Sequence, residues 1–157
     1  MQEVDAATGR VLLTLSESHT IMRYLADTRG CPNHWYPKMA QPRERALVDE
    51  YLDQHHNFLR QGVTGLLLKQ VKTFQVLRDG RTYSEPEINF HRVILQRAMS
   101  LLESRLETKP YLCGNEISIA DLSAASELDG ARWLPDFDLT EYPKTKEWSE
   151  RVIDANP

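Results

Sequence analysis

The helical spacing of the apolar residues is the feature that most constrains this chain of 157 residues. Beyond residue 18, apolar side chains recur three or four positions apart over long stretches, such as residues 43–60 and 84–106. That period is typical of an α-helix with one buried face. Strand-like sequence is confined to residues 2–4 and 10–15, which is too little for an independent sheet. The pattern therefore predicts a mainly α-helical fold.

Proline, glycine and capping signals divide the helical sequence. Ser16 or Ser18 is a candidate cap for the first helix, and Ser84 with Glu87 has the spacing of a capping box. A glycine pair within the second helical stretch predicts a kink or a break there. The predicted helices start at residue 16 or 18, 43, 84, 118 and 142, a Pro-rich connector covers 31–42, and the glycine pair is Gly62 and Gly65.

The first residues read as a small β-hairpin. Residues 2–4 and 10–15 are the strands, and the turn between them ends at Gly9, which tolerates a positive φ. A lone two-stranded hairpin is marginal in water, and its edges need partners or cover. We therefore expect that a segment belonging upstream of Met1 is missing.

Composition and charge exclude several classes of protein. The chain has 19 Lys and Arg against 23 Asp and Glu, so it has no basic excess of the kind that nucleic-acid and lipid-binding proteins show. No apolar run reaches the ~18 residues of a membrane span, and the N-terminus does not read as a secretory signal. The two cysteines, Cys31 and Cys113, are far apart, which is typical of reduced thiols. We expect a soluble cytoplasmic protein.

The most informative local signal is YLCGNEISIADL, residues 111–122. Ser118 and Asp121 stand at capping-box spacing, and Ile117 with Leu122 has the spacing of a hydrophobic staple. Small side chains dominate the following turns, so neighbouring helices can approach closely. This segment therefore predicts the N-terminus of a central, buried helix.

Three segments together resemble the cytosolic glutathione transferases. LTLSESHTIMRYLA (residues 13–26) is similar to their strand–turn–helix motif, and YLCGNEISIADL to the folding motif of their helical domain. HWYPKMAQPRERALVDEYLDQHHNFLR (residues 34–60) resembles the theta class in particular. The resemblance implies an all-helical glutathione-transferase C-terminal domain preceded by the last β-hairpin and helix of a thioredoxin-like α/β domain. It implies a thioredoxin-like remnant at 1–30, a linker at 31–42 and the helical domain at 43–157.

Glu17 and Ser18 are the candidate ligand-binding residues. They lie at a strand-to-helix junction, where unpartnered N–H groups attract anions. The Ser18 hydroxyl and the Glu17 carboxylate suit an α-amino acid head group, which carries one carboxylate and one ammonium. The alternative is purely local, with a serine cap and an acid that complements the helix dipole. The resemblance implies that the ligand is the γ-glutamyl end of glutathione.

Arg60 is a third candidate binding residue. The resemblance implies that an Arg at this position approaches the glutathione site of a partner subunit, in a two-fold homodimer. The family has an acidic neighbour three positions earlier, where this chain has Asn57. The alternative is a solvated cation at a helix end, where the helix dipole favours positive charge.

We assign no catalytic residue in this chain. The glutathione thiol titrates near ~8.5 and needs a donor that stabilises the thiolate. In theta-like enzymes that donor is a Ser near the protein N-terminus, in a region that this chain lacks. The resemblance thus implies a truncated transferase that conjugates glutathione to an electrophilic substrate when complete and is nearly inactive alone. The alternative function is a non-catalytic dimerisation or docking module.

The remaining candidates point to structure. His55 and His56 are adjacent and should face different sides of a helix, so we expect no metal site. Residues 66–74 are expected to contribute to an electrophile pocket, as the family's equivalent helix does. The aromatic residues predicted to pack in the core are Tyr51, Phe58, Trp133 and Trp148, and Phe90 is placed on the apolar face of its helix.

Overall fold

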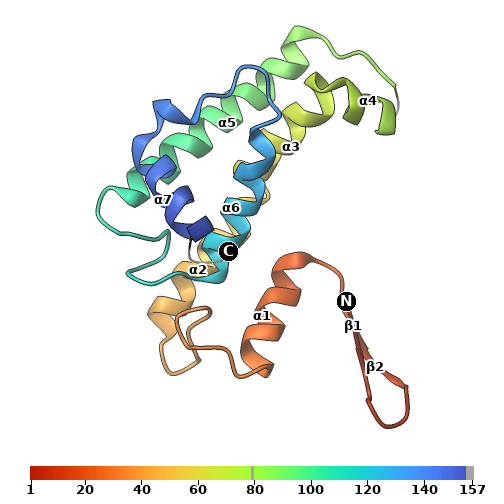
Figure 1. Cartoon of the computed structure of the whole chain (residues 1–157), viewed down its shortest axis with the longest axis vertical. Helices are drawn as coiled ribbons and strands as arrows, with labels where there is room; N and C mark the ends of the chain where they lie inside the picture. Colours follow the sequence, from red (N-terminus) through yellow and green to blue (C-terminus); the bar gives the residue numbers. More distant parts are fainter. Residues whose placement is uncertain (79, 155–157) are drawn as a thin grey trace.

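The computed structural model describes residues 1–78 and 80–154 and shows a hairpin followed by helices (Figure 1). The predicted mainly helical fold is confirmed. The predicted end of the last helix at Pro157 lies outside the described residues. The elements are β1 (Gln2–Val4), β2 (Val11–Thr14), α1 (Ser18–Thr28), α2 (Pro42–His55), α3 (Leu59–Gln70), α4 (Lys72–Arg78), α5 (Glu85–Leu106), α6 (Ile119–Ala131), the 3₁₀ turn η1 (Leu139–Glu141) and α7 (Pro143–Asp154).

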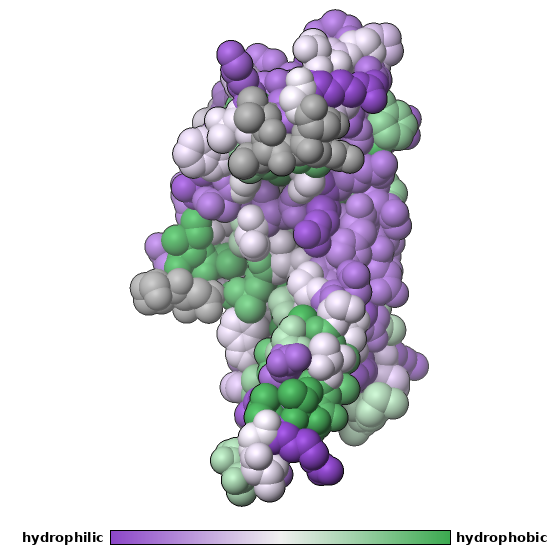
Figure 2. Space-filling model, turned by 90° about the vertical axis from the view of Figure 1, so that its right-hand side faces the viewer, coloured by the Kyte–Doolittle hydropathy of each residue, from purple (hydrophilic) through white to green (hydrophobic). Residues whose placement is uncertain are grey.

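The hairpin projects away from the helical body (Figure 1). Its strands are antiparallel, with Gln2 opposite Thr14, and Gly9 has the positive φ that its turn requires. Valine and leucine side chains on it are about half exposed, and Figure 2 shows apolar residues gathered over this part of the surface. Within the described residues, β1 and β2 form a sheet of two strands.

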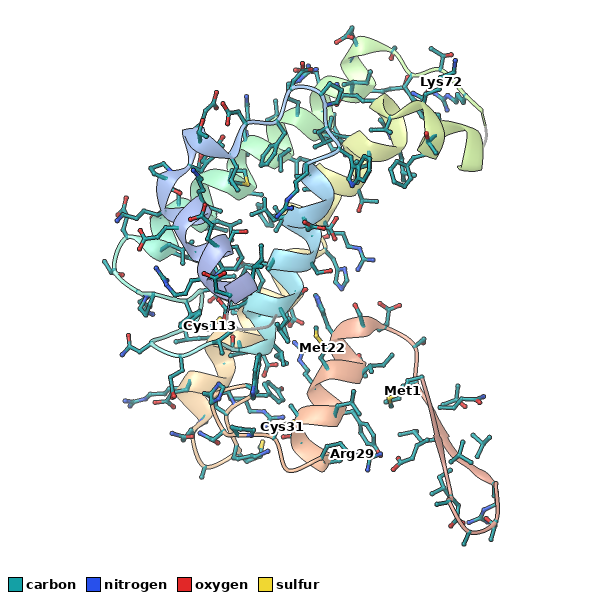
Figure 3. All side chains as sticks on the ribbon, viewed as in Figure 1. Met1, Met22, Arg29, Cys31, Lys72 and Cys113 are labelled. Carbon is teal, nitrogen blue, oxygen red and sulfur yellow. The ribbon has the colours of Figure 1, made fainter. Side chains whose placement is uncertain are left out.

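Helix α1 connects the hairpin to the bundle. At its C-terminal end, Arg29 forms an ion pair with Glu3 of β1 at 2.7 Å. On its other side, Arg23 binds Asp49 of α2 at 2.8 Å. Met22 packs against the core from the face of α1 that is turned toward the bundle, whereas Arg29 lies near the hairpin (Figure 3).

Helix α6 lies at the centre of the bundle. It packs against α1, α2, α3 and α7, while α3 runs along α5. Small residues make this central position possible, because Ala120, Ala124 and Ala131 are completely buried. The prediction of a central helix with small side chains is confirmed.

Asp121 organises the N-terminus of α6 from a completely buried position. Its carboxylate accepts hydrogen bonds from the Ser118 backbone N–H and from the Ser118 hydroxyl. Ser118 and Asp121 thus form the predicted capping box. It also accepts one from the Leu112 N–H and one from Trp148 Nε1 of α7, each at 2.9 Å. Burial raises the pKa of Asp121, and these hydrogen bonds oppose the rise. One carboxylate thus connects a loop, a helix cap and a second helix.

Gly62 and Gly65 do not kink or break the helix, contrary to the sequence prediction. The break lies earlier, at residues 56–58, and both glycines lie inside α3. A Cβ at Gly62 would stand 2.7 Å from Leu95 Cα, and one at Gly65 would stand 2.1 Å from His91 Nδ1. The glycines therefore serve close packing of α3 on α5, a demand that helical periodicity does not reveal.

The aromatic predictions divide into two pairs. Tyr51 and Trp148 are buried, as expected, at 4% and 0% exposure. Phe58 and Trp133 are 39% and 71% exposed, so their placement in the core was wrong. Phe58 lies in the turn before α3 and Trp133 in the turn after α6. Phe90 is likewise exposed, whereas Ile88 of the same helix is buried.

No helix in the described part of the chain is both long enough and apolar enough to cross a lipid bilayer.

We expect Gly62→Ala to destabilise the protein by about 1–3 kcal/mol, because the new methyl group meets the Leu95 backbone, which cannot rotate away. Chemical denaturation measures the change. Gly130→Ala in α6 is the matched control, because its Cβ would meet side chains at 3.6 Å or more. It should be neutral or stabilise by up to about 1 kcal/mol. Equal effects of the two variants would contradict the close-packing role.

We expect Asp121→Asn to destabilise the protein by about 2–4 kcal/mol. The amide NH₂ group would face N–H groups that now donate hydrogen bonds to the carboxylate, and some of these buried donors would be left unpaired. Thermal unfolding measures the loss. The exposed Asp129→Asn in the same helix is the control and should change stability by less than about 0.5 kcal/mol.

Candidate functional site

The turn before α1 has an unusual backbone. Glu17 has φ 68° and ψ 113°, and it is the non-glycine residue with positive φ among those described. Glu17 itself is the N-cap residue, without a side-chain capping bond, so the prediction that Ser16 or Ser18 caps this helix was wrong. The positive φ turns the chain at the residue between the two serines. Ser18 is the first helical residue, and both Glu17 and Ser18 are exposed.

This geometry leaves the first turn of α1 available to a ligand. Its N–H groups are not capped by the N-cap side chain, and the positive end of the helix dipole lies there. A backbone in a sparsely populated region stores strain, which is commonly found where a protein binds a ligand. The arrangement suits an anionic group on the helix N-terminus with a carboxylate beside it.

His19 anchors that turn to the bundle. Its ring is 4% exposed, and its Nε2 lies 2.7 Å from the Ser123 hydroxyl of α6. The ring also packs against His55 at the end of α2 and against His56 in the following turn, with centroid distances of 5.1 and 4.4 Å. No local sequence pattern connects His19 with His55 or His56, which lie more than 30 positions away. Their contact places the start of α1 against the corner between α2 and α3.

Burial, together with the nearby His55, His56 and Arg23, lowers the pKa of His19 to about 4. His19 is therefore neutral at pH 7. Two protonated rings about 5 Å apart would repel by about 3 kcal/mol at an effective dielectric constant of ~20. A positive charge on His19 therefore disfavours this packed contact.

Arg60 lies in the first turn of α3, about half exposed. Its Nε stands 3.9 Å from the Glu127 carboxylate of α6. The position three residues earlier, where the family has an acid, holds Asn57, which is exposed in the turn. The acid comes from another helix. The one sequence signal that could have pointed to this acidic partner is the single glutamate among the small residues of α6.

Glu127 holds several groups at this corner. It accepts a hydrogen bond from the Thr64 hydroxyl at 2.7 Å, and His55 Nε2 lies 3.8 Å away. Burial raises the pKa of Glu127, but its contacts with His55, Thr64 and Arg60 outweigh burial and bring that pKa below its usual value. The carboxylate is therefore ionised at neutral pH and attracts the Arg60 guanidinium.

A shallow depression of about 480 Å³ lies along α3 beside Arg60. Its lining is mostly polar and includes His56, Arg60, Thr64 and Lys69. No carboxylate is among the lining residues, so the depression favours an anionic group. It begins at the corner to which His19 holds the first turn of α1.

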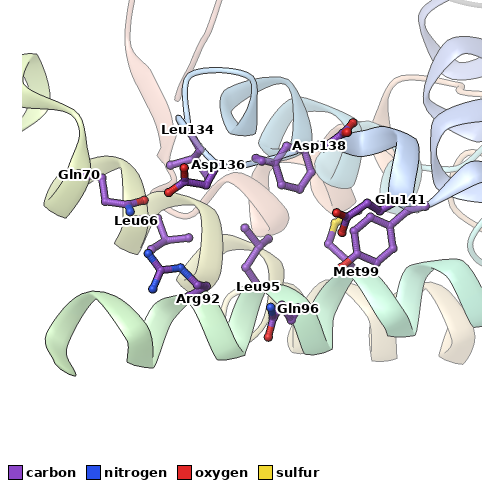
Figure 4. Close-up of a pocket in the computed structure, with 12 residues that line it drawn as sticks. Leu66, Gln70, Arg92, Leu95, Gln96, Met99, Leu134, Asp136, Asp138 and Glu141 are labelled. Carbon is purple, nitrogen blue, oxygen red and sulfur yellow. The ribbon is translucent and has the colours of Figure 1, made fainter. Parts of the chain in front are cut away.

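A second, more apolar pocket of about 120 Å³ lies between α3, α5 and the segment before α7 (Figure 4). Leu66, Leu95 and Met99 form its floor, and Asp136 and Arg92 stand at its rim. Within residues 66–74, the stretch expected to contribute to an electrophile pocket, Leu66 and Gln70 line this pocket. Leu68 and Lys69 instead line the depression beside Arg60.

Among residues 1–78 and 80–154, no group of three His, Cys, Asp or Glu side chains is placed to hold a metal ion. Cys31 and Cys113 are both free thiols. Burial raises the pKa of Cys113 to about 12, so this thiol is not a nucleophile at neutral pH.

Comparison with known proteins identifies the family. The family model "Glutathione S-transferase, C-terminal domain" matches residues 25–156. The chain belongs to the glutathione S-transferase family. The chain is 32% identical over 143 residues to chicken glutathione S-transferase theta-1, covering 90% of this chain and 53% of the relative. It is 35% identical to the human theta-1 protein, covering 88% of this chain and 57% of that protein.

Solved structures of theta-class transferases share the fold. A mutant of human glutathione S-transferase T1-1 in its apo form superposes with a TM-score of 0.79 at 33% identity, covering 91% of this chain and 59% of that one. Human glutathione transferase theta-2, solved in complex with glutathione and an unknown ligand, gives 0.77 at 29% identity, covering 94% and 57%. The chain thus spans about half the length of the relatives that it matches.

Proposed function

We propose that this chain forms the helical domain and the glutathione-anchoring turn of a theta-like glutathione transferase. The complete protein would add the glutathione thiolate to an electrophilic substrate. The observation that carries the proposal is the uncapped, positive-φ turn at Glu17, which precedes the N-terminus of α1. Homologues named as theta transferases support it and favour it over a non-catalytic docking module.

In this proposal, Glu17 and Ser18 hold the γ-glutamyl group of glutathione. The ligand carboxylate would accept hydrogen bonds from the Ser18 hydroxyl and from first-turn N–H groups, which the helix dipole strengthens. The ligand ammonium would lie beside the Glu17 carboxylate. Both side chains are exposed, so no rearrangement of the bundle is needed for binding.

Arg60 would serve the glutathione site of a second subunit. Its attraction to Glu127 restrains a long side chain that is otherwise about half exposed, and it faces a depression without carboxylates. We propose a cytoplasmic homodimer in which Arg60 of each subunit approaches the ligand of the other. Leu66 and Gln70, further along α3, would contribute to the electrophile side.

We propose that the chain divides as its motifs imply. Residues 1–30 belong to a thioredoxin-like unit, residues 31–42 form the linker, and residues 43–157 form the helical domain. The half-exposed aliphatic side chains of the hairpin support the first assignment, because a complete unit would cover them.

Calorimetric titration with glutathione tests the binding site. We expect Ser18→Ala and Glu17→Ala each to weaken binding about ten- to a hundred-fold, because each removes a charge-assisted contact. Glu116→Ala, which alters an exposed loop acid, is the matched control and should bind as the unmodified chain does. Binding that is absent from the unmodified chain, or unchanged by both variants, would contradict the assignment.

Turnover tests the missing step. In an assay with a broad aromatic electrophile and glutathione at pH 7, we expect this chain to give a rate near the uncatalysed one. None of its residues is assigned to stabilise the thiolate, and a thiol near ~8.5 is mostly protonated at that pH. A rate comparable to that of a complete transferase would show that the chain activates the thiol itself.

A further inference from the structure

The histidine contact between α1 and the bundle is a cluster that the proposed binding function does not use. His19 reaches from α1 to Ser123 of α6, and its ring packs against His55 and His56. His19 and His55 are 4% and 3% exposed, so water reaches neither ring freely. The contact joins residues far apart in sequence.

The charged groups around His19 come from three elements. From α1, Arg23 stands nearby, already bound to Asp49 and Asp53 of α2. From the end of α2 come His55 and His56. From α6, Glu127 faces His55, and Thr64 and Arg60 also contact that carboxylate.

Within the described part of the chain, the His19 ring makes no ion pair with a carboxylate. A proton added to this ring would be buried next to other cationic or protonatable groups. Burial of an unpaired charge is costly, so the ring either stays neutral or leaves the contact.

We propose that His19 is an acid-sensitive positioning residue whose neutral ring holds the first turn of α1 on the helical bundle and whose protonation releases α1 with the hairpin. The helix and hairpin are joined to each other by the Arg29–Glu3 pair, and Figure 1 shows them at the edge of the helical bundle.

The direction of the pH dependence follows from the lowered pKa of His19. The released ring takes up a proton near pH 6.5, whereas the docked ring resists protonation down to about 4. Docking is therefore fully stable above pH 6.5 and weakens as the pH falls toward 4. Between pH 7.5 and 5.0 the docking equilibrium should fall roughly thirty-fold.

Release would also affect the ligand site. Ser18 directly precedes His19, so the turn at Glu17 would leave the α2–α3 corner when the ring does. This consequence rests on the proposed function. The acid-sensitive contact of His19 does not, because it is observable without glutathione.

Native-state hydrogen exchange of the unliganded chain tests the proposal. Protection factors, corrected for intrinsic exchange at each pH, are measured for α1 and α5 at pH 7.5 and 5.0. We expect α1 to lose protection roughly thirty-fold while α5, which lies outside the cluster, keeps its protection. An unchanged α1, or an equal loss in α5, would overturn the proposal.

His19→Gln removes the titration and keeps a polar group in reach of Ser123. We expect its α1 protection to be independent of pH over this range, whereas the matched variant His34→Gln, outside the cluster, should behave as the unmodified chain. A pH-dependent loss that persists in His19→Gln would assign the effect to other groups and refute the role of His19.

If His19→Gln does not fold, as judged by α5 protection, NMR titration of the unmodified chain decides. A His19 ring that titrates near pH 6.5 in the folded protein refutes the proposal. A ring that titrates well below pH 6.5 supports the proposal.

Discussion

The hydrogen bonds of Asp121 are the interaction on which the helical body depends. A buried carboxylate needs a full set of donors, and here they come from three separate segments: the loop at Leu112, the cap at Ser118 and helix α7 at Trp148. Satisfying the carboxylate therefore requires α6, α7 and the loop to be in place together. The small residues that follow then allow α6 to occupy the middle of the bundle.

The same helix also supplies the acid that faces the candidate site. Glu127 follows Asp121 by six positions, which at 3.6 residues per turn places it on a different face of α6. Asp121 faces α7 and the loop, whereas Glu127 faces Thr64 and Arg60 of α3. One central helix thus stabilises the fold on one side and positions the cation of the proposed glutathione site on another.

Local sequence patterns predicted where helices begin better than they predicted which residues contact one another. The capping boxes at Ser84 and Ser118 are present where their spacing placed them, because a cap depends on residues a few positions apart. The glycines of α3 and the aromatic Phe58 and Trp133 were misplaced, because their environment depends on which helix lies opposite. Glu17 and Ser18 could be nominated from sequence, but the positive φ that distinguishes their turn could not.

The sequence by itself determined the helical class, the N-terminal hairpin, the capped starts of α5 and α6 and the family resemblance, all of which arise from short-range spacing. Only the tertiary structure decided that Arg60 is drawn toward Glu127 and that His19 meets His55 and His56. The physical reason is separation along the chain. A side chain's charge partner and degree of burial depend on helix packing, which brings together residues that no local pattern connects.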